Sequence, residues 1–180
     1  MDKVAVFEKV SYEQFKKDYK RTFEKYFFGE CPKEEYIKEV YDNIQLPTRA
    51  TKCSAGHDFF AYEDIKIEAG STILIPTGVK CHMVNGWMLN IFPRSGLGFN
   101  YGVRLANTVG IIDGDYYNNK NNEGHIFIKL VNDAKFAKDL IIKKDTAYCQ
   151  GIFIKYGIVS DDNVNAERTG GFGSTNKADE

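Results

Sequence analysis

The sequence of 180 residues has no long apolar run, no large excess of charge of either sign and no closely spaced pair of cysteines. Its first residues, MDKVAVFEKV, lack the apolar stretch of a signal peptide, and no other segment is apolar over the length of a bilayer. The four cysteines lie far apart, which argues against a disulfide framework or a zinc site. We therefore expect a reduced, cytoplasmic protein without a membrane partner.

Basic patches and histidine clusters are missing as well. The formal net charge is −1 and no long basic block occurs, so we expect no nucleic-acid partner. The three histidines, His57, His82 and His125, stand at none of the usual metal-binding spacings, which argues against a histidine metal site. What is present is a hydrophobic composition of 43%, enough for one domain with a sizeable core.

The N-terminal part of the chain carries two patterns with helical spacing. Ser11 and Gln14 of the sequence SYEQ can form a capping box, and aromatic residues recur at every third or fourth position after it. The segment CPKEEYIKEVYDNI has Pro32 in its first turn and one apolar side. Both apolar faces predict packing surfaces, so we expect residues 1–46 to form a helical extension packed on the core.

The pattern changes after Pro47, where short runs rich in Val, Ile, Phe and Thr alternate with Gly, Asn, Asp and Pro. Runs such as STILIPTGVKCHMV, GWMLNIF and GHIFIKLVN stand too close together for long helices between them. We therefore expect a mainly β sandwich or barrel over residues 47–160. Residues 161–180, which end in RTGGFGSTNKADE, have no hydrophobic periodicity and predict a flexible arm.

Three segments combine turn residues with polar or charged side chains: AGHDFFAYEDI, FPRSGLGF and NTVGIIDGDYYNN. Arg94 and nearby N–H groups can be presented together to an anion. Asp113, Asp115 and Tyr116 follow an apolar run and could position a water, a metal or a sugar. A turn with solvated charges explains the Arg94 segment equally well and the Asp113 segment better, so these residues alone leave both interpretations open.

Taken in order, these segments resemble the five motifs of the trimeric dUTP diphosphatases, the dUTPase family. SAGHDFF is similar to the first motif, PRSGLG to the second, NTVGIIDGDYY with EGHI to the third, AYCQGIF to the fourth and RTGGFGST to the fifth. The resemblance runs from Ser54 to Thr175 and leaves the N-terminal helices outside. It implies a jelly-roll-like β-fold and a homotrimer whose active sites are shared between subunits.

The resemblance also implies the activity. The protein would hydrolyse dUTP to dUMP and pyrophosphate, which limits uracil incorporation into DNA and supplies dUMP for dTMP synthesis. Asp113 would be the catalytic base for the water that attacks the α-phosphorus. The substrate would be bound by Arg94, Ser95 and Gly96 at the phosphates, Asn107 at the uracil, Tyr116 at the deoxyribose, Gln150, and the arm residues Arg168, Phe172, Gly173, Ser174 and Thr175.

The implied cofactor is Mg2+, held by the phosphates of dUTP. Asp58 and Gln150 would contact the ion only through water, and no direct protein ligand is expected. In the arm, residues 161–180, Arg168 would hold the γ-phosphate and Phe172 would stack on the uracil. The arm would close over the active site of a neighbouring subunit.

The sequence also departs from the family pattern. Ala147 stands where an arginine is usual, Gly114 replaces a serine, and the turn YNNKNNEG is longer than the common form. Two other functions compete with dUTP hydrolysis. One is a dCTP deaminase-like enzyme of the same fold, and the other is a nucleotide-sensing regulatory protein that binds partners through its N-terminal helices or its longer hairpin. The GIIDGDYY hairpin and the glycine-rich arm favour phosphate hydrolysis over deamination.

Overall fold

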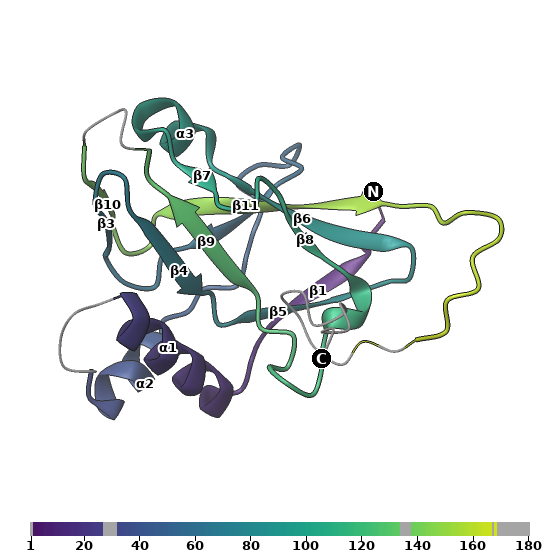
Figure 1. Cartoon of the computed structure of the whole chain (residues 1–180), viewed down its shortest axis with the longest axis horizontal. Helices are drawn as coiled ribbons and strands as arrows, with labels where there is room; N and C mark the ends of the chain where they lie inside the picture. Colours follow the sequence, from purple (N-terminus) through teal and green to yellow (C-terminus); the bar gives the residue numbers. More distant parts are fainter. Residues whose placement is uncertain (1, 27–31, 134–137, 167, 169–180) are drawn as a thin grey trace, which may run out of the picture.

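The computed structural model describes residues 2–26, 32–133, 138–166 and 168, and most of its elements are strands (Figure 1). In chain order the elements are β1 (Ala5–Lys9), α1 (Tyr12–Tyr26), α2 (Glu34–Asp42), β2 (His57–Phe60), β3 (Ile65–Ile67), β4 (Thr72–Pro76), β5 (Val79–Met83), β6 (Trp87–Pro93), α3 (Ser95–Tyr101), β7 (Arg104–Leu105), β8 (Gly110–Ile112), the 3-10 turn η1 (Gly114–Tyr116), β9 (Phe127–Val131), β10 (Leu140–Ile142) and β11 (Ala147–Lys155).

The strands of the described residues pair antiparallel in four small sheets. The largest has the order β2-β11-β6-β8, a second has the order β4-β9-β7, and β1 and β10 pair with β5 and β3. The expected mainly β fold with an added N-terminal helical segment is confirmed. β11 lies between β2 and β6 and therefore carries residues of the fourth motif beside those of the first and second.

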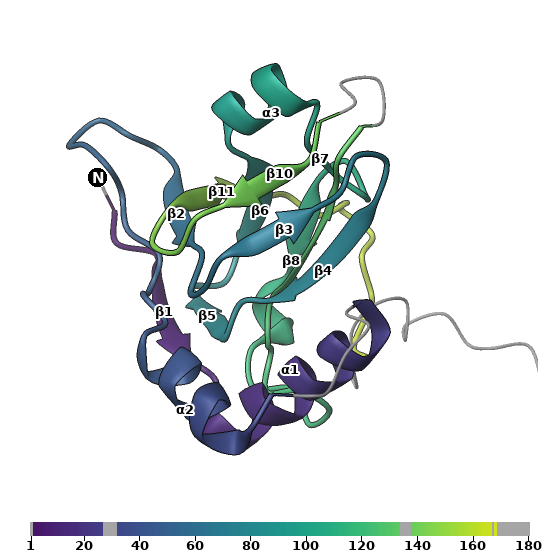
Figure 2. The same cartoon turned by 90° about the vertical axis from the view of Figure 1, so that its left-hand side faces the viewer.

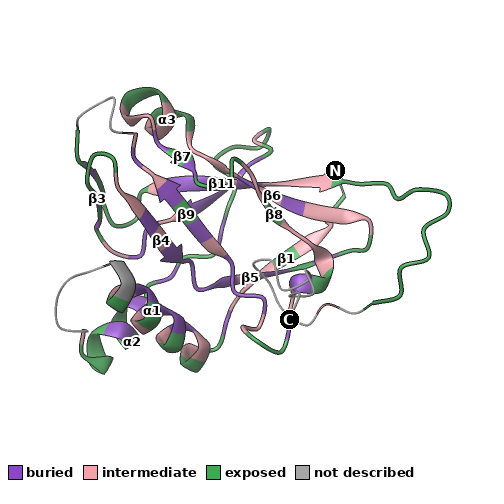
Figure 3. Ribbon diagram, viewed as in Figure 1, coloured by how far each residue is buried: buried purple, intermediate pink, exposed green. Residues whose placement is uncertain are grey.

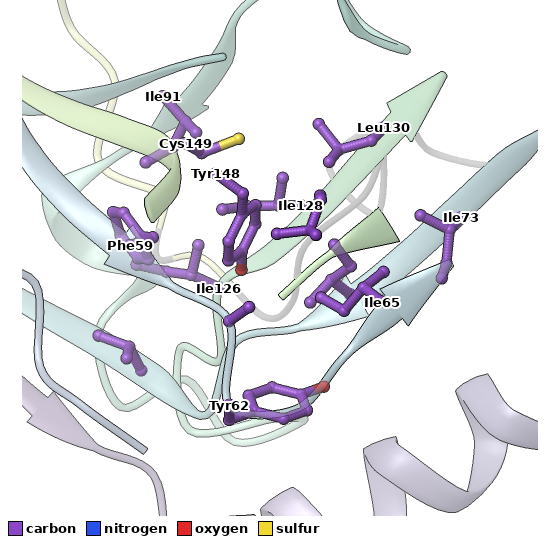
Figure 4. Packing of buried hydrophobic residues seen from close by; sticks show 14 of the residues in the cluster. Phe59, Tyr62, Ile65, Ile73, Ile91, Ile126, Ile128, Leu130, Tyr148 and Cys149 are labelled. Carbon is purple, nitrogen blue, oxygen red and sulfur yellow. The ribbon is translucent and has the colours of Figure 1, made fainter. Parts of the chain in front are cut away.

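The core lies between the sheets. Along β9, Ile128 and Leu130 are buried while Lys129 between them is exposed, as expected for a strand with one face on the core (Figure 3). Figure 4 shows the ring of Tyr148, from β11, close to Ile128 in the interior. Burying an aliphatic side chain of this size contributes about 1.5–3 kcal/mol, so this alternation stabilises the sheet pairing.

The helices α1 and α2 lie together at one end of the β-structure (Figure 2). Phe15 of α1 and Ile37 of α2 are fully buried in the same core cluster as the strands, which agrees with the predicted apolar faces. None of the helices in the described ranges is long and apolar enough to cross a membrane.

A strand that the sequence did not predict precedes these helices. β1 pairs with β5 in a register that places Phe7 opposite Cys81. A five-residue run is too short to show a clear period, and its pairing partner lies far along the chain. The predicted boundary between a helical extension and the β-domain at residue 46 stays a prediction. β1 lies before that boundary but pairs with β5, which lies after it.

The expected capping box at the start of α1 forms only in part. The N–H of Gln14 donates to Oγ of Ser11 at 3.2 Å, but the side chain of Gln14 donates to Oδ2 of Asp18. The N–H and hydroxyl of Ser11 instead donate to the carboxylate of Glu123, at 2.8 and 2.6 Å. The acid that completes the cap therefore comes from a distant loop, and this contact ties α1 to that loop.

Candidate active site

The hairpin around β8 borders a pocket of about 210 Å³. β8 pairs with β6, and Gly110 opposite Ile91 lets the two backbones pack closely, because an added Cβ would lie 3.2 Å from that side chain. The pocket is lined by Asn107, Gly110, Ile111, Ile112, Asp113, Tyr116, Phe127 and Arg168. Four residues singled out from the sequence, Asn107, Asp113, Tyr116 and Arg168, therefore share one pocket.

Asn107 is held at this pocket by a strained turn. The N–H of Val109 donates to the carbonyl of Asn107 at 2.7 Å, and Thr108 between them has a φ of 66°. β-branched residues rarely adopt this left-handed conformation, and such backbone strain costs about 1–3 kcal/mol. Tertiary contacts outside the turn must hold it in place.

Tyr116 is fixed through its hydroxyl. The ring is buried, and the hydroxyl donates to the carbonyl of His125 at 2.8 Å and accepts from Nδ2 of Asn122 at 2.7 Å. Burial raises the pKa of Tyr116. Gly124 packs against the same residue with a φ of 78°, and a Cβ there would lie 2.6 Å from the carbonyl oxygen of Tyr116. The ring therefore forms a rigid wall of the pocket.

Two carboxylates stand at the edge of this pocket and share one arginine. Nε of Arg168 donates to Oδ1 of Asp115 at 2.7 Å, and Nη2 donates to Oδ2 of Asp113. The Asp113 side chain remains 49% exposed, so water reaches it. A half-exposed carboxylate beside a pocket has the position that a general base requires.

A second group of predicted residues gathers on β2, β11 and the end of β6. Asp58 and Gln150 are opposite each other in register, and Nη1 of Arg94 donates to Oδ1 of Asp58 at 2.6 Å. Asp58 is 5% exposed, so this ion pair compensates a nearly buried charge. Gly56 leaves room for the amide of Gln150, since a Cβ would lie 2.3 Å from its Oε1. Ser95, at the start of α3, is exposed beside Arg94.

Within one chain, the pocket group that contains Asp113 and the second group, around Arg94, lie apart. Ile112, just before Asp113, pairs with Leu89 near the start of β6, whereas Arg94 directly follows the last residue of β6. Asp113 comes level with Met88, six residues before Arg94, and at about 3.3 Å per strand residue this separates the two positions by about 20 Å. The phosphate-binding candidates and the candidate base therefore do not face one cavity within a single chain.

The structure also places residues that the sequence patterns did not single out. Phe127 forms part of the pocket wall. Asn119 and Asn122 of the long turn YNNKNNEG support Tyr116, and so does His125 directly after that turn. Nδ2 of Asn119 donates to the Tyr116 carbonyl at 2.9 Å. The asparagine-rich run marks a turn in the sequence, but local pattern does not show which ring such a turn supports.

Phe172, Gly173, Ser174 and Thr175 lie outside the described residues. Ala147, at the position of the expected arginine, is half-buried on β11 opposite Phe60. Within the parts of the chain that are described, no group of three or more His, Cys, Asp or Glu side chains is arranged to hold a metal ion.

A family model, curated protein sequences and a solved structure that are similar to this chain all carry names of the same family. The dUTPase family model matches residues 42–176. A deoxyuridine 5'-triphosphate nucleotidohydrolase from Lactococcus lactis is 42% identical over 135 residues, which cover 73% of this chain and 88% of that protein. The enzyme of the same name from Nautilia profundicola is 35% identical over 146 residues, which cover 78% of this chain and 97% of that protein. The crystal structure of dUTPase from Streptococcus mutans superposes with a TM-score of 0.59 at 40% identity, covering 66% of this chain and 91% of that one.

Proposed function

The chain belongs to the dUTPase family, and we propose that it hydrolyses dUTP to dUMP and pyrophosphate. The observation that carries this proposal is the pocket in which Asn107, Tyr116 and Asp113 meet. It combines an amide, an aromatic wall and a carboxylate at its edge, which are the groups needed to bind a nucleoside beside a phosphate that is to be cleaved.

The pocket suits a deoxyribose. We propose that the ring of Tyr116 packs against the sugar and leaves no space for a 2′-hydroxyl, so that dUTP is selected over UTP by steric exclusion. The fixed position of the Tyr116 hydroxyl supports this role, because a ring that cannot move aside rejects an additional atom. Asn107 and neighbouring backbone groups read the uracil.

Asp113 acts as the general base of the proposed reaction. Its carboxylate takes a proton from a water, and the water oxygen bonds to the α-phosphorus while the bond from that phosphorus to the bridging oxygen breaks. Pyrophosphate is the leaving group. Arg168 pairs in this structure with Asp113 and Asp115 of its own chain. In the proposed reaction it would leave both carboxylates and bind the γ-phosphate in a neighbouring subunit's site, so that Asp113 is free for the water.

Mg2+ is the proposed cofactor, and the residues present fit it. Asp58 and Gln150 lie on adjacent strands and supply oxygen atoms, the donor type that Mg2+ prefers. Two side chains are too few to hold the ion alone. This agrees with an ion that is bound mainly by the phosphates of the substrate and that the protein contacts only through water. When bound, the ion neutralises charge on the phosphate oxygens.

A homotrimer with shared sites is also proposed. The separation of about 20 Å between Arg94 and Asp113, from the strand rise, is longer than a triphosphate can bridge while its α-phosphorus stays at Asp113. A second copy that presents its Arg94, Ser95 and Gly96 to the Asp113 pocket would complete the site. Residues 161–180 would then close over a neighbouring subunit's site.

Pyrophosphate release by the purified protein with Mg2+ tests the activity. Offered dUTP, dCTP, dTTP and UTP separately, the protein is expected to release pyrophosphate rapidly from dUTP alone, because the Tyr116 and Asn107 filters reject the other three. Ammonia from dCTP without pyrophosphate from dUTP would instead identify a deaminase. Nucleotide binding without any turnover would identify a nucleotide-sensing protein.

Mixing two inactive variants tests the shared site. Arg94→Gln removes the phosphate contact but can still donate to buried Asp58, and Asp113→Asn removes the base. If each site takes these residues from different copies, equimolar mixed assemblies are expected to recover about a quarter of wild-type turnover, since one site in four then carries both native residues. The control is each variant refolded alone. No recovery in verified mixed assemblies would mean that one copy supplies both residues.

A further inference from the structure

The N-terminal segment makes three polar contacts with the loop that follows Tyr116, here called the η1–β9 loop (residues 117–126). The hydroxyl of Tyr117 donates to Glu8, Ser11 donates to Glu123, and Nδ1 of His125 lies 2.7 Å from Oδ2 of Asp18. The N-terminal partners precede residue 42, where the match to the dUTPase family model begins. A segment outside the shared family region therefore braces the loop that supports the nucleoside pocket.

The contact between Asp18 and His125 is the most buried of the three. The exposed fraction is 2% for Asp18 and 0% for His125. The N–H of Gly78 donates to Nε2 of His125 at 2.7 Å, so the ring carries its proton on Nδ1 and donates it to Asp18. Burial lowers the pKa of His125 against the effect of Asp18. The pair is therefore a neutral imidazole held by a carboxylate.

Asp18 is itself held in one position. Burial alone raises its pKa, but hydrogen bonds from His125 and Gln14 outweigh that effect and keep the pKa of the carboxyl below its usual value. Nε2 of Gln14 donates to Oδ2 at 2.6 Å, and Nη2 of Arg21 lies 3.4 Å from Oδ1. A buried carboxylate with donors on both oxygens has little freedom to move.

His125 connects this carboxylate to two walls of the pocket. Its carbonyl accepts the hydrogen bond from the Tyr116 hydroxyl at 2.8 Å. Its ring lies 4.6 Å, centroid to centroid, from the ring of Phe127. The guanidinium of Arg21, one turn after Asp18 on α1, lies 5.6 Å from the centroid of the Phe127 ring. The position of α1 is thus transmitted to both aromatic residues of the pocket.

We propose that Asp18 is a positioning residue for sugar selection: through His125 it holds Tyr116 and Phe127 where a 2′-hydroxyl does not fit. The proposal rests on the function proposed above. Removing the carboxylate leaves the buried Nδ1–H of His125 without an acceptor, which drives the ring to a new position. Tyr116 and Phe127 can then move and make room for the 2′-hydroxyl of UTP, while Asp113 at the pocket edge keeps its position.

The test compares Asp18→Leu, Asp18→Asn and Glu13→Leu. Leucine has the same number of side-chain heavy atoms as aspartate, branched at the same position, and removes the acceptor, whereas asparagine keeps one uncharged acceptor oxygen for His125. Glu13→Leu is the matched control, because it also replaces an acid with leucine on the same helix, at a side chain that is 74% exposed. For each variant, thermal unfolding and kcat and KM with dUTP and UTP are measured.

For Asp18→Leu, the ratio of kcat/KM for dUTP to that for UTP is expected to fall about tenfold or more, equivalent to about 1.4 kcal/mol. The effect should lie in KM, with kcat for dUTP within about twofold of wild type because the chemical groups are untouched. Asp18→Asn should fall between Asp18→Leu and wild type, since an uncharged acceptor forms a weaker hydrogen bond. Glu13→Leu should match wild type.

A lower unfolding temperature with unchanged selectivity would overturn the proposal and leave Asp18 a structural residue only. If Asp18→Leu does not fold, the Asp18→Asn variant decides the question. Reduced selectivity at unchanged kcat supports the proposal, and unchanged selectivity overturns it.

Binding affinities for dUMP and UMP, measured by calorimetry, test the positioning role independently of the hydrolytic activity. A wild-type protein that releases no pyrophosphate, yet prefers dUMP and loses that preference in the Asp18 variants, would refute hydrolysis and retain the positioning role. A wild-type protein that does not prefer dUMP would refute the positioning role.

Discussion

Replacing Asp113 with asparagine is expected to lower the turnover of dUTP by about a hundredfold or more, the scale of a positioned general base. Asparagine has nearly the same shape as aspartate, but its amide cannot take the proton from the attacking water. The pocket walls formed by Tyr116 and Phe127 do not depend on this carboxylate, so binding should persist. Initial rates of pyrophosphate release, and calorimetry with the non-hydrolysable α,β-imido analogue of dUTP, measure the two effects separately.

Asp115→Asn is the matched control for this prediction. Asp115 also pairs with Arg168 and sits in the same turn, but its carboxylate is outside the set of residues that line the pocket. Loss of its charge should therefore change turnover far less than loss of Asp113. Near-normal turnover in Asp113→Asn would mean that another group activates the water, and equal losses in both variants would assign the effect to the arginine pairing.

Removing residues 168–180 is expected to leave a folded protein whose kcat/KM for dUTP is about tenfold lower or more. The expected losses are the contact of Arg168 with the γ-phosphate and the stacking of Phe172 on the uracil, and stacking of a base on an aromatic ring contributes about 1–3 kcal/mol. The fold should survive because residues 156–166, which lead to the deleted segment, are exposed and contribute no buried side chain. Thermal unfolding and steady-state kinetics with dUTP check both statements.

Two single substitutions divide this effect into its parts. Phe172→Trp keeps an aromatic face and should retain most of the activity, whereas Phe172→Ala should lose it in KM. Arg168→Lys keeps the charge but not the two parallel hydrogen bonds that a guanidinium makes with a phosphate. A truncated protein with wild-type kinetics would refute the role of residues 168–180 as a lid.

Much of the fold follows from local pattern. The helical spacing of Phe15 and Tyr19 and the dense β runs after Pro47 predict elements that the structure contains. Such predictions work because a helix or strand with one buried face must repeat its apolar residues at a fixed period. β1 was missed because its partner β5 is distant in sequence, and the capping acid Glu123 was missed for the same reason.

By itself, the sequence determined which chemical groups this protein carries and in what order. The run GIIDGDYY places Asp113 and Tyr116 on one turn, and that proximity needs no tertiary information. Only the tertiary structure decided that Arg94 lies at the other end of β6 from Asp113, and that Asp18 of α1 reaches His125 behind the pocket. Contacts of this kind join segments far apart in the chain, and they depend on strand register and helix docking, which leave no periodic signal in either segment alone.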